Sequence, residues 1–467
     1  MNRQYFPVMP IVCLLFLAGC TMTELPELES TDVPQAWQGP TEEEALVWPD
    51  RDWWVSFDNK ELSDIINQVQ QNNLDLEINR RNLESAQIAL REAGFNLLPT
   101  PLVTFGTGAA YSETRVDGVS SSDSPNIPFD LEAGFTYTDI LSKPATFDRA
   151  VADYDSRVAQ AADVALNTLG TAASTYFQLL LTRDKIVAAN QNVENAEAIY
   201  RIAQARVDAG VAVPIEALQQ QIAMERERNN LRGFVQNDLA TRASLALLVG
   251  KTVQGFEIGG QTLQTISLPA VQPGLPSELL IRRPDLVQAE ANLRSARASV
   301  DIVRTDLFPQ ISLTGAFSAS STSLSELVSD PDTFLTINAN LVQTLLDNGQ
   351  RFRNIDQAKI TMENSLNNYR RAVINAFNEV EVLLSNIQLL QSQGVVAFQN
   401  LEAAEEAFRI AQVRYEEGVT DYQTVLTSQN TLFATRNSYL DNKLLQLNAL
   451  VGLFQALGGG WQAGETL

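Results

Sequence analysis

The stretch that decides the fold runs YRIAQARVDAGVAVPIEALQQQIAMERERNNL from Tyr200 to Leu231. A second version, FRIAQVRYEEGVTDYQTVLTSQNTLFATRNSY, runs from Phe408 to Tyr439, 208 residues later. Each version reads as a helix, a stop at the shared Gly-Val pair, and a second helix, because glycine takes the left-handed conformation that ends a helix without a steric penalty. Pro214 suits the first turn of the restarting helix in the first version. A helical hairpin that occurs twice indicates two versions of one unit.

Composition excludes several classes of function. The chain of 467 residues has a formal charge of −23 and a pI near 4.4, which argues against nucleic acid and anionic lipid as partners. It has no histidine, so a Ser-His-Asp triad, a Cys-His nucleophile and a histidine-ligated metal are excluded. The two cysteines, Cys13 and Cys20, both lie at the extreme N-terminus, and no GxxxxGK[ST] nucleotide motif is present. We therefore expect no enzyme activity, no cofactor and no metal site.

The N-terminus reads as a processing segment. Arg3 and the short apolar run from Ile11 to Leu17 suit a signal peptide over residues 1–19. The sequence Leu17-Ala18-Gly19-Cys20 resembles a bacterial lipobox, which implies cleavage before Cys20 and lipidation of that residue. The alternative is an ordinary signal peptide with a chance cysteine. Thr21, in place of aspartate after the cysteine, implies the outer membrane, and residues 20–60 then form a lipidated extension.

Two regions change from helical periodicity to strict alternation. Residues 102–112 and 129–138, and later residues 311–320 and 335–341, place apolar side chains on one face and small polar or acidic ones on the other. We expect strands within about 99–140 and 309–346, with residues 115–126 as a loop. A soluble sandwich would give the same alternation, but carboxylates and glycines opposite an aromatic-bearing face are typical of transmembrane barrels.

The helical regions are unusually long. We expect helices over about 61–94, 144–209, 214–249 and 349–417. At 1.5 Å per residue, the second would be on the order of 100 Å long. Between Phe352 and Leu401, fifteen apolar residues recur with a mean spacing of 3.5 (fourteen steps over 49 residues), which predicts coiled-coil packing.

One motif gives a specific resemblance. The stretch LPSELLIRRPD, from Leu275 to Asp285, resembles the helix-opening motif of outer membrane factors of the TolC superfamily, in their lipoprotein (NodT-type) branch. Three further stretches resemble other motifs of that branch: Trp53-Trp54, Asp347 to Arg351, and Ala456 to Trp461. The counterpart of Asp347-Asn348-Gly349 in the first repeat begins at Asp139 and lacks the usual Phe-Gly, so the strand-to-helix geometry there is expected to differ.

The resemblance and the physics imply a similar architecture. The expected fold is mainly helical with transmembrane β-structure: a trimeric α/β-barrel, with four strands per protomer in a shared 12-stranded barrel on a long periplasmic coiled-coil barrel. Four strands cannot close a barrel, and open edges in lipid leave backbone groups unsatisfied, so other copies must close it; the number three comes from the resemblance. The expected parts are two efflux repeats, 61–250 and 277–457, a linker, 251–276, and a tail, 458–467.

The implied function is a passive exit duct. Its expected partners are two further copies, a periplasmic adaptor and an inner-membrane pump, usually of the resistance-nodulation-division type, and its expected location is the outer membrane of a Gram-negative bacterium. It would carry drugs or other small toxic molecules. One alternative is a duct for protein secretion, and another is a structural coiled-coil lipoprotein without a pore.

Particular residues are expected to serve this function. The adaptor should dock on the two turns, at Gly210-Val211 and Gly418-Val419. Three-fold rings of carboxylates at these turns should form the periplasmic gate, with Asp421 favoured and the arginines as counter-charges between helices; the alternative is that the carboxylates simply face solvent. The gate candidates are Asp421, Arg414, Glu416, Glu417, Arg206 and Asp208. The family-motif residues Arg282, Arg283, Pro284 and Asp285 are expected at a helix start and in contacts between subunits, rather than in a substrate site.

Overall fold

The structure of the protein is a computed structural model. It describes residues 34, 36–38, 48–108, 113–116, 119–122, 128–259, 261–270, 274 and 276–461. The chain divides into two units, Met1–Pro34 and Gln35–Leu467, and the following concerns the second. Cys20 and the signal segment therefore lie outside the described residues, as do most of the N-terminal extension and residues 462–467.

Long helices dominate the second unit. The first repeat contains α2 (Lys60–Asn72), α3 (Leu74–Phe95), α4 (Lys143–Asp208) and α5 (Pro214–Leu248). The second contains α6 (Leu279–Arg282), α7 (Pro284–Thr305), α9 (Gln350–Glu416) and α10 (Tyr422–Ala456). Short 3-10 turns lie at Trp53–Phe57 (η1), Leu263–Thr265 (η2) and Pro276–Glu278 (η3). Across the described ranges, no helix is both long enough and apolar enough to cross a membrane.

The expectation of one continuous helix over 61–94 was wrong, because the helix breaks at Asn73. The backbone of Asn73 is extended, and its side-chain oxygen caps α3 by accepting from the amides of Asp75 and Leu76. Its side-chain nitrogen donates to the carbonyl of Leu248 at 2.8 Å. The break thus fastens the start of α3 to the end of α5.

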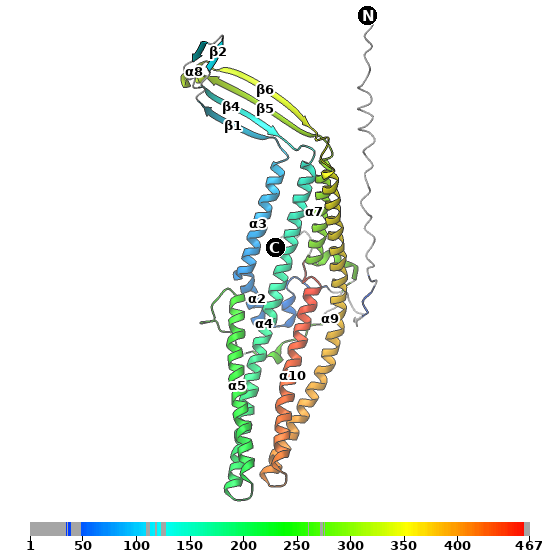
Figure 1. Ribbon diagram of the computed structural model, residues 1–467. Helices are drawn as coiled ribbons and strands as arrows, with labels where there is room; N and C mark the ends of the chain where they lie inside the picture. The colour runs from blue at the N-terminus through cyan, green and yellow to red at the C-terminus, as the bar shows by residue number, and fades with distance from the viewer. Residues whose placement is uncertain are drawn as a thin grey trace. The chain divides into compact units, whose positions relative to one another are not determined.

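The predicted repeat is present as two helical hairpins, α4–α5 and α9–α10. Figure 1 shows them side by side within this unit, with their turns at the end away from the sheet. Each is clamped by an ion pair at the same place: Arg228 to Glu197 at 2.8 Å in the first, and Arg436 to Glu405 at 2.9 Å in the second. Both pairs span 31 residues, so the repeat extends to individual side-chain contacts.

The predicted strands form one antiparallel sheet in the order β1-β4-β5-β6. Its strands are β1 (Thr100–Thr107), β4 (Phe129–Tyr137), β5 (Gln310–Ser321) and β6 (Asp332–Val342), two from each repeat. The expected loop at 115–126 is not wholly irregular, because β2 (Glu113–Val116) and β3 (Val119–Ser122) pair there as a separate hairpin. A short helix, α8 (Leu324–Ser329), precedes β6. Strands β1 and β6 each lack a neighbour on one side among the described residues.

The alternating apolar and polar residues of the strands form two different faces of the sheet. Register places Val103 opposite Ala133, Ala133 opposite Phe317 and Phe317 opposite Leu335, so these four lie in one row across the apolar face. Val103 and Leu335 are 72% and 73% exposed in a single copy. The other face carries small and polar residues, including the exposed carboxylates Asp130 and Glu132.

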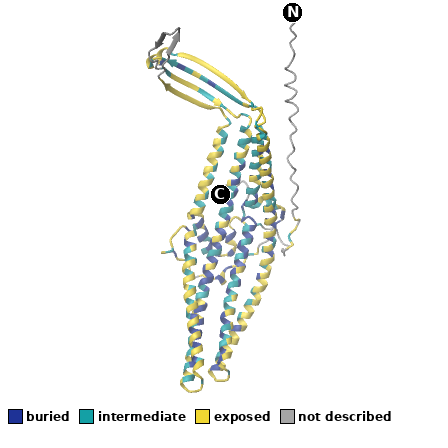
Figure 2. Cartoon of the chain, in the orientation of Figure 1, coloured by how far each residue is buried: buried dark blue, intermediate teal, exposed yellow. Residues whose placement is uncertain are grey.

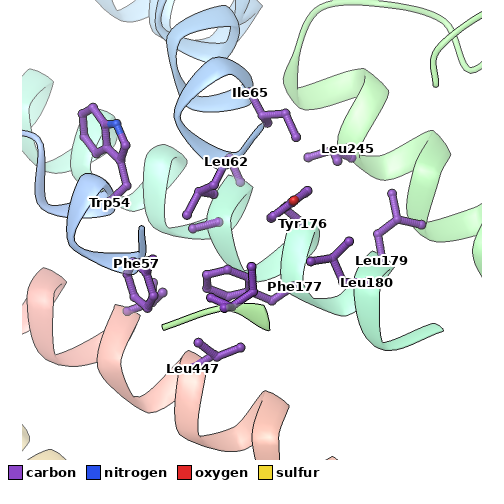
Figure 3. Packing of buried hydrophobic residues seen from close by; sticks show 14 of the residues in the cluster. Trp54, Phe57, Leu62, Ile65, Tyr176, Phe177, Leu179, Leu180, Leu245 and Leu447 are labelled. Atoms are coloured by element: carbon purple, nitrogen blue, oxygen red, sulfur yellow. The ribbon is translucent and has the colours of Figure 1, made fainter. Parts of the chain in front are cut away.

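The main core lies among the helices rather than at the sheet (Figure 2). Leu62 of α2, Phe177 of α4, Leu245 of α5 and Leu447 of α10 meet there, as Figure 3 shows, and all four are fully buried. The ring of Trp53 stacks on that of Phe454 with centroids 5.2 Å apart. A second apolar cluster fills the interior near the hairpin turns. The two hairpins are therefore anchored in the main core at the ends of α5 and α10 and packed again near their turns.

Candidate functional site

The two hairpin turns have the geometry that the sequence indicates. Gly210 and Gly418 have φ of 70° and 73°, and the amides of Val211 and Val419 donate back to the carbonyls of Arg206 and Arg414. A Cβ at Gly210 would meet no atom within 4 Å, so the backbone conformation, not crowding, selects glycine. Val211 and Val419 are 66% and 60% exposed. Each turn therefore leaves a valine side chain exposed directly after its glycine.

The four carboxylates proposed for the gate are all exposed in a single copy. Asp421 caps the start of α10: its Oδ1 accepts from the amide and the hydroxyl of Thr424 at 2.8 and 2.6 Å. These hydrogen bonds lower the pKa of Asp421, so the carboxylate is charged at neutral pH. Asp208 accepts from Gln204 one turn back on α4. Glu416 likewise accepts from Gln412 on α9.

The two candidate arginines differ. Arg414 is exposed, and no carboxylate in the described ranges forms an ion pair with it. Arg206 bridges the two hairpins, from α4 to α9, as expected for a counter-charge between helices. Its acceptor is nevertheless not a carboxylate: Nη1 donates to the carbonyl of Tyr415 at 3.2 Å, and the guanidinium lies 4.8 Å from the centroid of the Tyr415 ring.

Tyr415 extends this link to a third helix. Its hydroxyl donates to Glu216 of α5 at 3.3 Å. Burial first, and then the charge of Glu216, raises the pKa of Tyr415 to about 12, so the hydroxyl keeps its proton. The ring of Tyr415 also contacts that of Tyr422, with centroids 6.2 Å apart.

A buried amide pair lies beside the tyrosines. Gln220 is fully buried, accepts from the hydroxyl of Tyr422 at 3.0 Å and donates to the carbonyl of Ala196 at 3.1 Å. Its nitrogen also lies 3.5 Å from the side-chain oxygen of Gln429, which is 1% exposed. Gln429 matches Gln221 in the repeat, but neither Gln220 nor Gln429 was predicted to have a role. One signal was available: Gln220 lies at helical spacing from Ala217 and Met224, on an otherwise apolar seam. A polar residue on such a seam fixes how coiled helices pair.

The family motif joins three helices. The side chain of Arg283 is 12% exposed. Its guanidinium forms ion pairs with Asp285 at 2.9 Å and with Glu379 of α9 at 2.8 Å. It also donates a hydrogen bond of 3.0 Å to the carbonyl of Ala456 at the end of α10. Burial alone would lower the pKa of Arg283, but the two carboxylates raise it, so the guanidinium stays charged. Pro284 opens α7. These contacts lie within one copy and support the expected role at a helix start.

Arg282 connects the motif to both ends of the described chain. Its guanidinium lies 4.8 Å from the ring of Trp48. Its carbonyl abuts Gly458, where a Cβ would come within 2.2 Å of that oxygen. Gly458 has φ of 87°, so both backbone conformation and space require glycine there.

The strand-to-helix turns differ between the repeats, as expected. In the second, Asn348 and Gly349 have φ of 55° and 74°, and Asp347 accepts from the amides of Gly349 and Arg351. The side chain and amide of Arg351 lower the pKa of Asp347 to about 2. In the first, Asp139 alone takes the left-handed conformation, with φ of 54°.

Comparisons with known proteins agree with this geometry. The profile of the outer membrane efflux protein family matches residues 65–251 and 275–459, the two repeats. The pyoverdine export outer membrane protein OpmQ of Pseudomonas aeruginosa is 30% identical over 97% of this chain and 96% of its own length. The cation efflux system protein CusC of Escherichia coli O6:H1 is 27% identical over 97% and 99%. The crystal structure of the Campylobacter jejuni CmeC outer membrane channel superposes with a TM-score of 0.82 at 22% identity, covering 91% of each chain.

Both repeats are thus matched by one family, the similarity to relatives spans nearly the whole chain, and the fold is that of solved outer membrane channels. With its paired helical hairpins and its four-stranded sheet, the chain belongs to the outer membrane efflux protein family.

Proposed function

We propose that three copies of this chain form the exit duct of a tripartite efflux system, in which a periplasmic adaptor connects the duct to an inner-membrane pump of the resistance-nodulation-division type. The family to which the chain belongs forms trimeric channels that work with an adaptor and an inner-membrane pump. The observation that carries the proposal is the sheet of four strands, whose two edges have no neighbour in the described ranges and whose faces are apolar on one side and polar on the other. Conduction is passive, since the chain has no nucleotide motif.

The sheet supports closure by copies of itself. The free edge of β1 in one copy and the free edge of β6 in the next can satisfy each other's backbone groups, which lipid cannot do. Apolar residues of β6, such as Ile337 and Leu341 at 69% and 64% exposure, would then face lipid. Asp130 and Glu132, on the opposite face, would line the lumen.

The adaptor would dock on the two hairpin turns. Both turns are exposed, each presents a valine directly after its glycine, and three copies offer six similar turns. Gly418→Val should disrupt this surface, because a β-branched residue is strained at a φ of 73°. The matched control is Gly233→Val on α5, where φ is not positive and a Cβ would meet nothing within 4 Å.

We expect Gly418→Val to reduce adaptor crosslinking and drug resistance, while the amount of channel inserted in the outer membrane stays equal to that of Gly233→Val. Crosslinking and resistance equal to those of the control variant would rule out this docking surface.

The gate would lie at the same turns. Under three-fold symmetry, an inward-facing Asp421 becomes a ring of three charges that favours cations, with Glu416, Glu417 and Asp208 as further acidic positions. Arg414 is exposed and so could reach a carboxylate on an adjacent copy.

Asp421→Asn combined with Arg414→Gln should raise single-channel conductance, lower cation preference and sensitise cells to large antibiotics such as vancomycin. Wild-type conductance and cation preference in this double variant would place the constriction elsewhere.

For cargo, our first candidate is a siderophore. Two relatives at 30% and 31% identity, each matched over at least 96% of its length, are named for pyoverdine export. Deleting the gene should lower the amount of the host's own siderophore in iron-limited medium, and a plasmid copy should restore it. Unchanged secretion in the deletion strain would favour another small toxic molecule.

A further inference from the structure

A cavity of about 260 Å³ lies between α3, α4 and the two ends of the described chain. Leu76 and Leu83 of α3 and Leu166 and Leu169 of α4 supply an apolar wall, and Ala165 leaves space between them. A water molecule needs two to four polar partners, which this wall does not offer. This side of the cavity is therefore suited to an apolar group.

Three tryptophans complete the lining. The chain has five tryptophans, and Trp53, Trp54 and Trp461 all border this cavity. Trp53 and Trp54 are 2% and 3% exposed and also belong to the main core, where Figure 3 shows Trp54 near Leu62. Trp461 is 9% exposed, and its indole N–H has no acceptor among the described residues. A buried donor without a partner costs about 1–3 kcal/mol, so a ligand that accepts from it gains binding free energy.

Positive charge lies at the same place. Arg51 and Arg80 both line the cavity, together with Gln70 and Asn79. Arg80 is paired with Glu77, whereas no ion-pair partner of Arg51 occurs in the part of the chain that the structure describes. A Cβ on Gly460 would come within 2.4 Å of the backbone nitrogen of Arg51, so Arg51 is adjacent to the residue that precedes Trp461. An unpaired guanidinium and an unpaired N–H therefore lie on neighbouring backbone segments.

The C-terminal glycines fix this arrangement. Gly459 and Gly460 have φ of 56° and 76°, so both lie in the left-handed region. A Cβ on Gly459 would come within 2.2 Å of Leu166, a wall residue. The glycines allow the end of the described chain to lie close to α4 and Arg51. The next residue, Trp461, therefore lies at the cavity.

We propose that this cavity binds a monocarboxylate with a linear alkyl chain. The alkyl chain would occupy the wall of leucines and tryptophans, and the carboxylate would accept from Trp461 and pair with Arg51. This site involves neither the sheet nor the hairpin turns.

The test uses the full-length trimer in lipid nanodiscs and 8-bromooctanoate, whose bromine quenches indole fluorescence on contact. Quenching should be saturable and should be reversed by unbrominated octanoate. Competing affinity should rise about fourfold per added methylene from butanoate to octanoate. Octan-1-ol should compete at least about tenfold more weakly than octanoate, because it lacks the charge.

Two variants locate the site. Trp461→Phe keeps an aromatic ring but removes the N–H, and should weaken octanoate binding about tenfold. Ala165→Phe fills the space and should abolish binding. Trp48→Phe, outside the cavity, is the matched control and should bind as the wild type does.

Circular dichroism and trimer mass establish that each variant is folded. The proposal is overturned by quenching that does not saturate, by octan-1-ol competing as well as octanoate, or by Trp461→Phe and Ala165→Phe both binding like Trp48→Phe.

Discussion

Replacing Arg206 by glutamine should loosen the link between the two hairpins and favour the open channel. The side chain of Arg206 makes two interactions with Tyr415: a hydrogen bond of 3.2 Å to the carbonyl, and a guanidinium 4.8 Å from the ring centroid. Glutamine is shorter and uncharged, so it loses both. Tyr415 would keep its hydrogen bond to Glu216, so the loss is confined to the contact between α4 and α9.

The size of the effect follows from these two interactions. A long hydrogen bond from a charged donor contributes about 1.5 kcal/mol. A cation–π contact at a half-buried site adds about 0.5–1 kcal/mol. The sum of about 2 kcal/mol per copy corresponds to about a 30-fold change in the ratio of open to closed hairpin arrangements, if opening separates these residues.

Single-channel recording in planar bilayers measures this ratio. Arg206→Gln should raise the open probability or the conductance, and Arg206→Lys, which keeps the charge but loses the planar group, should give an intermediate value. Arg201→Gln is the matched control, since Arg201 is exposed on the same helix. If Arg206→Gln and Arg201→Gln record alike, the link to Tyr415 does not hold the channel closed.

Four further outcomes are expected. Cys20→Ser should abolish lipidation, and an intact mass that still includes acyl chains would reject the anchor. Light scattering of the detergent-solubilised protein should give the mass of three chains; a monomer would contradict the proposed barrel. Arg283→Ala should raise hydrogen exchange at the start of α7 and the end of α10, by about 1–3 kcal/mol of lost local stability, because it leaves the carbonyl of Ala456 and two partly exposed carboxylates without their donor. Arg294→Ala, at an exposed pair, should cost under about 1 kcal/mol. The pKa of Asp347 is depressed to about 2, so the stability that Asp347 gives its turn should be complete above about pH 4 and lost as the pH falls toward 2. If the amide of Gly349 already exchanges at pH 5 as fast as it does in Asp347→Asn, this expectation is wrong.

Periodicity predicted the long elements well because each forms over many residues. The expected bounds of α4, α5 and α9 lie within one or two residues of those observed, since Pro214 and the glycines after each helix are local signals. The break at Asn73 was missed because an asparagine inside a long helical pattern is a weak signal, although this one caps α3 locally. Its second hydrogen bond, to Leu248, lies 175 residues away and has no local signal at all. The β2–β3 hairpin was missed because its short strands lie in a stretch that reads as loop.

The candidate site was predicted only in part. The two turns, their glycines and the exposed carboxylates followed from the repeat. The partner of Arg206 did not, because a sequence shows which charges exist but not that a backbone carbonyl and a tyrosine ring will accept one of them. Gln220 and Gln429 were likewise invisible as a pair, since their meeting depends on how two separate hairpins pack.

The sequence by itself determined the repeat, the hairpins, the two-faced strands and the absence of histidine chemistry, because these depend on residue type and on spacing along one segment. Only the tertiary structure decided which segments meet. It brought Arg283 to Glu379 and Ala456, joined the two hairpins through Tyr415, and formed a cavity lined by Trp53 and Trp461. Those contacts join residues tens to hundreds of positions apart, and their geometry is set by the packing of whole helices rather than by any local preference.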